Sequence, residues 1–343
     1  MQKFDPNPFE LQSHLDWQYE QKSSRFSLCA ASKVEFENWR VSFKKEISKI
    51  TGIAGRERRE SEIEILQTVD ARHYTKQLAA MKVGKDEIIP VYLLVPKREP
   101  PFQSILVFHG HDPSAEYCMG EVPDAKTRDQ NLGLNNNYAH VLAEAGYLVC
   151  VVEQRGLGNR VTHQISNETQ RSCRHLAFSY LMLGKTLLGE RILDGMSVLS
   201  YLTSRPDVTG HPGCTGHSAG GTTALWLAAL DERISVVVVS GYFCSFKESI
   251  LAMNHCECNY VPGMLTLGEM GDLAALIAPR PFRIIHGEQD LIFPVQFARS
   301  EFETVARAYQ INERQDAADL FIHSEGHMYH NRAACEWFDK WLV

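Results

Sequence analysis

The segment Gly216-His217-Ser218-Ala219-Gly220 restricts the fold of this chain more than any other feature. It is a Gly-x-Ser-x-Gly motif that ends an expected strand and opens an expected helix. Such a strand-to-helix turn lifts the serine Oγ clear of the sheet, where a base can reach it. Bulky residues two positions before or after the serine would clash, which accounts for Gly216 and Gly220. We therefore interpret Ser218 as a nucleophile rather than as part of a simple small-residue turn.

Strands and helices alternate along most of the chain. Residues 104–108 form a continuous apolar run, which is typical of a strand buried on both faces. The same reasoning predicts further strands at 147–152, 234–240, 282–286 and 320–323, and helices at 136–145, 185–203, 218–230, 295–309 and 333–342. This order predicts an α/β fold with a mostly parallel, twisted sheet of about eight strands and flanking helices. Functional groups should then gather at the carboxyl ends of the strands.

The first sixty residues have a different pattern. Apolar residues recur at helical spacing in 11–19 and 32–49, whereas 74–82 and 88–95 predict a β-hairpin. We expect an N-terminal helical extension over residues 1–60 and a catalytic domain over 61–343. Residues 242–280 lie between two expected strands and are interpreted as an inserted substrate or lid loop.

Composition excludes some function classes. The chain has 343 residues, a net charge of −7 and scattered Lys and Arg, which gives no reason to expect nucleic acid or an anionic membrane as a partner. Nine cysteines without a repeating frame and an N-terminus without an apolar targeting segment favour a cytoplasmic protein with reduced thiols. A homo-oligomer is possible, and we expect no cofactor.

A serine nucleophile needs a histidine base and an acid that orients it. The turn after the expected strand 282–286 contains Asp290, which we interpret as the acid, with Glu288 as the alternative. His327 follows Gly326 at the next corner and is the expected base. His323 and His330 are competitors, but neither follows a glycine.

The developing negative charge of an ester transition state needs N–H donors. One donor should be the N–H of Ala219, directly after the serine. The loop after strand 104–108 should supply the second from His111, with Gly110 allowing close approach and His109 supporting the loop.

Other polar residues lie near the same sheet edge. Glu153 and Arg155 could contact substrate, but we favour a structural ion pair between them. Cys256 and Cys258 with the adjacent His255 suggest zinc, yet the spacing differs from common structural sites and no second ligand pair is visible, so we expect no metal. The segment instead predicts a packed loop that lines the substrate pocket, and the residues expected to bind or support substrate also include His217 and Tyr260.

Several segments resemble the bacterial α/β-hydrolases grouped as acetyl xylan esterase-like and dienelactone hydrolase-like proteins. The shared motifs are His109-Gly110-His111, Gln154-Arg155-Gly156, Gly213 to Gly221, His255 to Gly263, Leu276 to Pro281 and Gly287-Glu288-Gln289-Asp290. The resemblance implies an α/β-hydrolase fold with a Ser218, Asp290 and His327 triad. Dienelactone hydrolases have a cysteine nucleophile, so Ser218 favours ester hydrolysis over lactone hydrolysis.

The sequence thus predicts a metal-independent serine carboxylesterase for small esters, with short acyl groups such as acetyl on a sugar or other small alcohol. The alternatives are a carbon–carbon bond hydrolase with a helical cap, a prolyl-type peptidase, and a non-catalytic binding protein on a hydrolase fold. The chain is too short for the large propeller domain that usually accompanies the peptidase.

Overall fold

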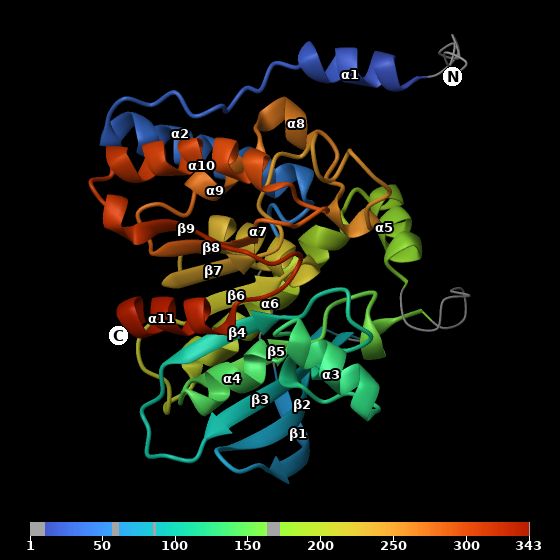
Figure 1. Ribbon diagram of the computed structural model, residues 1–343, viewed down its shortest axis with the longest axis vertical. Helices are drawn as coiled ribbons and strands as arrows, with labels where there is room; N and C mark the ends of the chain where they lie inside the picture. The colour runs from blue at the N-terminus through green and yellow to red at the C-terminus, as the bar shows by residue number, and fades with distance from the viewer. Residues whose placement is uncertain (1–10, 57–61, 85–86, 163–171, 343) are drawn as a thin grey trace.

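The computed structural model describes residues 11–56, 62–84, 87–162 and 172–342. One sheet of nine strands organises the chain, in the order β1-β2-β3-β5-β4-β6-β7-β8-β9 (Figure 1). The strands are β1 (Glu62–Asp70), β2 (Tyr74–Gly84), β3 (Glu87–Pro96), β4 (Ser104–Phe108), β5 (Leu148–Val152), β6 (Gly213–His217), β7 (Val236–Ser240), β8 (Phe282–Gly287) and β9 (Ala318–His323). In sheet order, the neighbours β1, β2, β3 and β5 pair antiparallel. The neighbours β5, β4, β6, β7, β8 and β9 pair parallel.

The prediction of about eight strands is corrected to nine. The strand that the sequence reasoning missed is β1, at the edge of the sheet, where nearly every side chain is exposed. A register shift between Ile65 and Gln67 also interrupts its pairing with β2. A strand without a buried face has no apolar alternation, so its sequence carries little signal.

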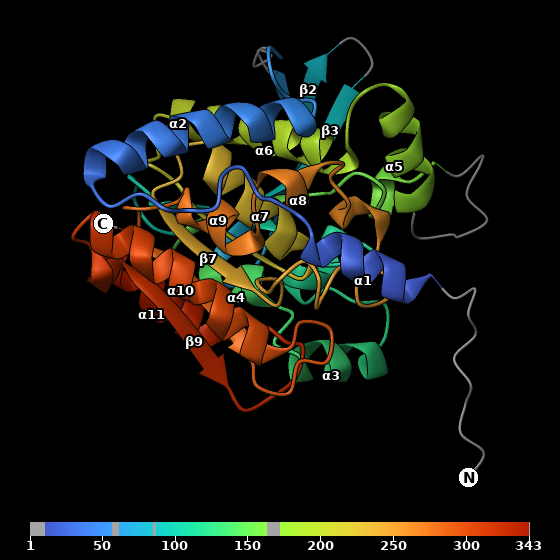
Figure 2. The ribbon, with the colours of Figure 1, turned by 90° about the horizontal axis from the view of Figure 1, so that it is seen from above.

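Helices cover both faces of the sheet (Figure 2). They are α1 (Gln12–Glu20), α2 (Lys33–Ile50), α3 (Ala125–Gly133), α4 (Tyr138–Glu144), α5 (Cys173–Met182), α6 (Leu187–Ser204), α7 (Ala219–Leu230), α8 (Met264–Leu267), α9 (Met270–Ala275), α10 (Val295–Ile311) and α11 (Asn331–Trp341), with short 3-10 turns η1 (Ala115–Met119), η2 (Gly158–Arg160), η3 (Glu257–Asn259) and η4 (Gln315–Ala317). In the described part of the chain, none of these helices combines the length and apolar composition that crossing a bilayer requires.

Alternate residues of the central strands point to two separate cores. In β4, Leu106 and Phe108 join the core formed with α2, α6, α7, α9 and α10. Ile105 and Val107 join the core formed with α4 and α11 on the other face. A strand buried on both faces explains why residues 104–108 read as an unbroken apolar run.

The N-terminal segment has two unlike parts. Helix α1 buries no side chain and lies at the far end of the molecule in Figure 1. Helix α2 buries Phe36, Phe43 and Ile47 in the first core, and the Ser32 side chain caps its first turn. The predicted boundary near residue 60 lies outside the described residues.

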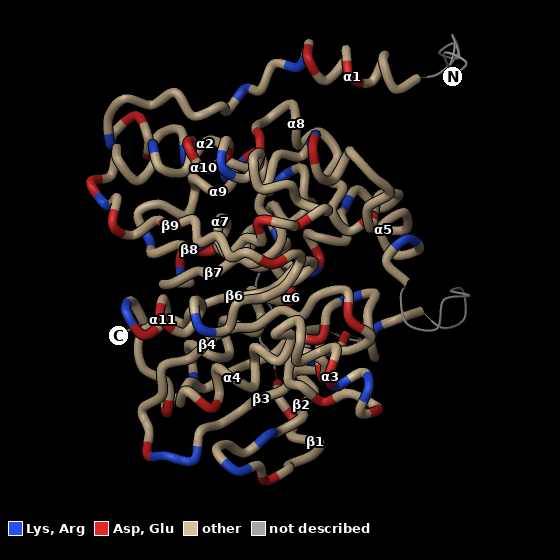
Figure 3. Tube along the Cα trace, viewed as in Figure 1, with Lys and Arg blue, Asp and Glu red and all other residues tan. Residues whose placement is uncertain are grey.

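The inserted segment 242–280 also has two parts. Its first half forms a loop with η3, whereas α8 and α9 bury Met264, Leu267 and Met270 in the first core. Charged residues of both signs are scattered along the trace (Figure 3).

Candidate active site

Ser218 lies at the junction of β6 and α7, in the middle of the sheet. Its backbone has φ 55° and ψ −118°, a conformation that a residue with a Cβ rarely adopts. Two backbone hydrogen bonds hold it: the Ser218 N–H donates to Ser240 O at 2.9 Å, and the Thr222 N–H donates to Ser218 O at 2.9 Å. Strain of this kind persists where the surrounding structure fixes it, as at many functional turns.

The two glycines of the motif have the steric role that the sequence predicts. A Cβ on Gly216 would lie 2.3 Å from the carbonyl carbon of Gly220. A Cβ on Gly220 would lie 2.0 Å from the carbonyl oxygen of Phe108 in the neighbouring strand β4. Both distances are far below van der Waals contact, so only glycine fits at either position.

Asp290 and His327 meet beyond the carboxyl ends of β8 and β9. His327 Nδ1 and Asp290 Oδ2 are 2.7 Å apart, and Asp290 Oδ1 accepts the backbone N–H groups of Ile292 at 2.9 Å and Phe293 at 3.1 Å. Burial alone would raise the pKa of Asp290, but the hydrogen bond and charge of His327 and the two N–H groups outweigh it and lower the pKa. Asp290 is therefore held as a carboxylate that fixes the imidazole.

The alternative residues have other surroundings. Glu288 is exposed on the same turn. His330 caps α11 by accepting the N–H of Ala333 at 3.1 Å, and the ring of His323 lies 5.6 Å from that of His330. The geometry therefore favours Asp290 and His327 over Glu288, His323 and His330 as partners of Ser218.

A small pocket of about 190 Å³ opens above Ser218. Of the residues predicted for the site, Gly110, His111, His217, Ser218 and His327 line it. The hydrogen bonds of the described residues do not include one from Ser218 Oγ to His327, and such contacts often tighten only when substrate binds.

The pocket also contains residues that the sequence reasoning missed: Asp112, Leu134 and Asn136. The Asn136 side chain donates to Asp112 Oδ1 at 2.9 Å, which joins the loop after β4 to the segment before α4. The predicted helix began at residue 136, but α4 begins at Tyr138. The polar run Asn135-Asn136-Asn137 was the available signal for a turn at this point.

The start of α7 and the loop after β4 border the pocket on two sides. Ala219 is the first residue of α7, so its N–H has no partner within the helix. Across the pocket, His109 fixes the start of the loop that carries Gly110 and His111: it is fully buried, and its Nε2 accepts the N–H of Gln154 at 3.1 Å. Burial, followed by the charge of Arg191, lowers the pKa of His109 to about 3, so the ring is neutral.

The predicted ion pair between Glu153 and Arg155 is wrong. Arg155 forms a bidentate pair with Asp194 on α6, at 2.8 and 2.7 Å. Glu153 is fully buried, accepts the N–H of Ala115 at 3.1 Å and lies 3.5 Å from His109 Nε2.

Burial raises the pKa of Glu153 to about 8, against the opposing effect of the Ala115 N–H. Since the pKa of His109 is low, the contact between Glu153 and His109 joins two neutral groups at neutral pH and is not a salt bridge. Both residues brace the loop after β4.

The other predicted binding residues have different surroundings. His217 lies under the catalytic histidine candidate: its Nδ1 is 3.1 Å from Ser240 Oγ, and its ring centroid is 4.7 Å from that of His327. His255 accepts the Asn259 side-chain N–H at Nδ1 and packs 5.5 Å from Phe293. Tyr260 donates to Ile250 O and lines a separate cavity of about 280 Å³. Cys258 contacts His111 Nε2 at 3.4 Å and Cys256 Sγ at 3.1 Å, and neither cysteine is among the residues that line the Ser218 pocket.

Comparison with known proteins agrees with this architecture. Residues 19–338 match the Abhydrolase family, to which the chain therefore belongs. The "Putative hydrolase YtaP" of Bacillus subtilis (strain 168) is 26% identical over 294 residues, which cover 83% of this chain and 94% of that protein.

Solved structures show the same fold. A "putative acetyl xylan esterase" from Bacteroides fragilis NCTC 9343 superimposes with a TM-score of 0.77 at 17% identity and covers 100% of this chain and 92% of that chain. A glucuronoyl esterase from Solibacter usitatus has a TM-score of 0.68 at 13% identity, with 92% of this chain and 96% of that chain covered. The family and these structures confirm the α/β-hydrolase fold and the resemblance found in the sequence.

Proposed function

We propose that this protein is a serine carboxylesterase that hydrolyses short-acyl esters of a sugar or other small alcohol. The observation that carries the proposal is the 2.7 Å hydrogen bond between His327 and Asp290 beside a strained Ser218 whose pocket also includes His327. Asp290 is the orienting acid, His327 the base and Ser218 the nucleophile. This set of roles is that of an acyl-transfer enzyme.

The reaction proceeds through an acyl-enzyme. His327 accepts the Ser218 proton as Oγ attacks the ester carbonyl, and the N–H groups of Ala219 and His111 bind the oxyanion. His327 then returns the proton to the leaving alcohol. Water, activated by the same imidazole, attacks the acyl-enzyme and releases the carboxylic acid and free Ser218.

The pocket supports a small, uncharged acyl group. Its volume of about 190 Å³ is below the range of roughly 300 to 1,000 Å³ that larger ligands occupy. The described lining residues include the Asp112 carboxylate and neither lysine nor arginine, which disfavours an anionic acyl group such as a uronate. The names of the structural neighbours, acetyl xylan esterase and glucuronoyl esterase, both denote sugar esters, and the charge of this pocket favours the acetyl case.

Parallel assays with acetyl, butyryl and aminoacyl reporter substrates test the proposal. We expect the acetyl ester to give the highest kcat/KM and the aminoacyl substrate to give none. Ser218→Ala should lower kcat by roughly 10⁴- to 10⁶-fold, because the nucleophile is lost. Mass spectrometry of the intact protein should detect an acyl adduct on Ser218 in the wild type and none in the variant. A variant that keeps more than a few percent of the activity would exclude Ser218 as the nucleophile.

A further inference from the structure

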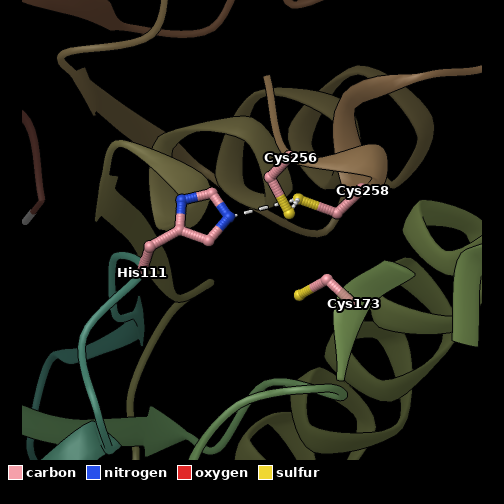
Figure 4. A group of neighbouring side chains, drawn as sticks. All are labelled: His111, Cys173, Cys256 and Cys258. Carbon is pink, nitrogen blue, oxygen red and sulfur yellow. Dashed lines mark hydrogen bonds between the residues drawn. The ribbon is translucent and has the colours of Figure 1, made fainter. Parts of the chain in front are cut away.

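Four side chains that can bind a soft metal ion lie together next to the loop after β4. They are the imidazole of His111 and the thiols of three cysteines, and we call this group the Cys/His cluster: His111, Cys173, Cys256 and Cys258 (Figure 4). Their four ligand atoms all lie within 4.8 Å of one another. The residues come from three segments: the loop after β4, the first residue of α5 and the loop that contains η3.

The distances suit a tetrahedral ion. With Zn–S bonds of about 2.3 Å and Zn–N bonds of about 2.0 Å, two sulfurs should be roughly 3.8 Å apart and a sulfur and a nitrogen roughly 3.5 Å apart. Cys258 Sγ is 3.4 Å from His111 Nε2 and 3.1 Å from Cys256 Sγ. In Figure 4 the four side chains point toward one another around a common space. Small changes in side-chain rotation would therefore complete a site with three thiolates and one imidazole.

The surroundings of the Cys/His cluster match its charge. Arg191 is buried, with 2% of its surface exposed, and donates to Cys173 Sγ at 3.3 Å. The Asn259 side chain donates to Cys258 Sγ at 3.7 Å. Three thiolates carry three negative charges, which the two charges of Zn²⁺ and the one of Arg191 balance. Donors of this kind to ligating sulfurs are the usual second layer of a metal–thiolate site.

The sequence alone pairs Cys256 and Cys258 with the adjacent His255 and offers no fourth ligand. The fold changes this set: His255 instead accepts a hydrogen bond from Asn259, and Cys173 and His111 join from 83 and 145 residues earlier than Cys256. We propose that the Cys/His cluster is a structural Zn²⁺ site that ties the loop after β4 to α5 and η3. Four protein ligands close the site, so the ion does not reach the substrate.

The site would act on the pocket only through position. His111 lines the pocket with its loop and offers Nε2 to the Cys/His cluster. An imidazole bound to an ion fixes the ring, and with it the backbone of His111. The metal proposal does not depend on the proposed esterase activity, and Ser218→Ala should bind the same metal as the wild type.

Metal analysis of the full-length protein, purified under reducing conditions without chelators, tests the proposal. We expect about one zinc ion per chain by mass spectrometry of the elements. After zinc is exchanged for Co²⁺, the absorption spectrum should show the visible bands of a tetrahedral ion and a near-ultraviolet thiolate-to-cobalt band. A protein that contains no zinc and gives only the spectrum of hydrated Co²⁺ would overturn the proposal. Peptide mapping of protein purified without reductant that shows a disulfide between any two of Cys173, Cys256 and Cys258 would also overturn it, because those thiols could not then bind the ion.

Matched cysteine variants locate the ion. Cys173→Ser should lower the intensity of the thiolate-to-cobalt band by about a third, since one of three thiolates is lost. Cys335→Ser is the control, because Cys335 lies on α11 outside the cluster. An equal loss of metal in both variants would contradict the assignment.

Alkylation of the wild type gives a second readout if the variants do not fold. Cys256 and Cys335 are both partly exposed, so their labelling rates can be compared in one protein. A strong chelator should speed the labelling of Cys256 several-fold and leave Cys335 unchanged. Equal rates for Cys256 with and without the chelator would overturn the proposal.

Discussion

Two buried carboxylates near the ends of parallel strands have opposite acid–base behaviour. Asp290, with 3% of its surface exposed, accepts two backbone N–H groups and the hydrogen bond of His327, and its pKa is lowered. Glu153 is fully buried, has one backbone donor and a neutral histidine beside it, and its pKa is raised to about 8. Burial is common to both, so the number and charge of the hydrogen-bond donors decide which carboxyl group ionises.

The difference gives the two groups opposite effects on stability as pH changes. Asp290 binds its proton more weakly in the folded than in the unfolded chain, so it stabilises the fold above pH ~4, and this contribution is lost as pH falls through its folded pKa. Glu153 keeps its proton in the folded chain while the unfolded chain releases it near pH ~4.3. Its contribution therefore decreases as pH rises from there to about 8 and is constant above that value.

The largest expected effect is on catalysis, from Asp290→Asn. The amide has no charge to stabilise the imidazolium and favours the wrong tautomer of His327, so kcat should fall by roughly 10³- to 10⁴-fold. Steady-state kinetics with the acetyl reporter ester measure this. If Asp290→Asn keeps most of the activity, Asp290 is not the acid. The difference in pKa between Asp290 and Glu153 would then play no part in catalysis.

A change in pH dependence is expected from Glu153→Gln. Glutamine stays neutral and can still accept the Ala115 N–H, so it removes the cost of keeping a buried carboxyl group. Between pH 5 and 8, the unfolding free energy of the variant minus that of the wild type should increase by at most ~1.4 kcal/mol per pH unit. Denaturant titrations at several pH values measure the increase. Parallel curves for the two proteins would show that Glu153 is ionised at neutral pH.

The smallest effect is expected from Glu288→Gln, which serves as the matched control for Asp290→Asn. Glu288 is an exposed carboxyl group on the same turn. Its substitution should change kcat by less than about twofold, as for most surface positions. A loss of more than tenfold would identify Glu288 as the acid and reverse the interpretation of the turn after β8.

The sequence predicted the parts of the fold that depend on local pattern. The run at 104–108 and the valines of β7 identified strands because both faces of each are buried. The glycines around Ser218 identified the turn because their steric role is local. β1 escaped prediction because its side chains are exposed and have no alternation.

The candidate site was predictable where its residues follow strand ends in a known order, as Ser218, Asp290 and His327 do. Residues brought together by tertiary structure were not. Asn136 reaches the pocket through Asp112, and Cys173 reaches Cys258 from a helix whose position no sequence pattern reveals. The prediction of the ion-pair partner of Arg155 was wrong for the same reason. The sequence suggested Glu153, two residues away, whereas the observed partner, Asp194, lies on α6.

The docking of α2 on the first core has a consequence for synthesis of the chain on the ribosome. Arg307 on α10 donates to the carbonyl of Leu28, just before α2, and these residues are 279 positions apart. At roughly 5 to 20 residues per second, about 15 to 55 s separate their translation. Phe36, Phe43 and Ile47 thus emerge long before the helices that cover them. The apolar face of α2 is therefore covered in stages, first by α7, then by α8 and last by α10.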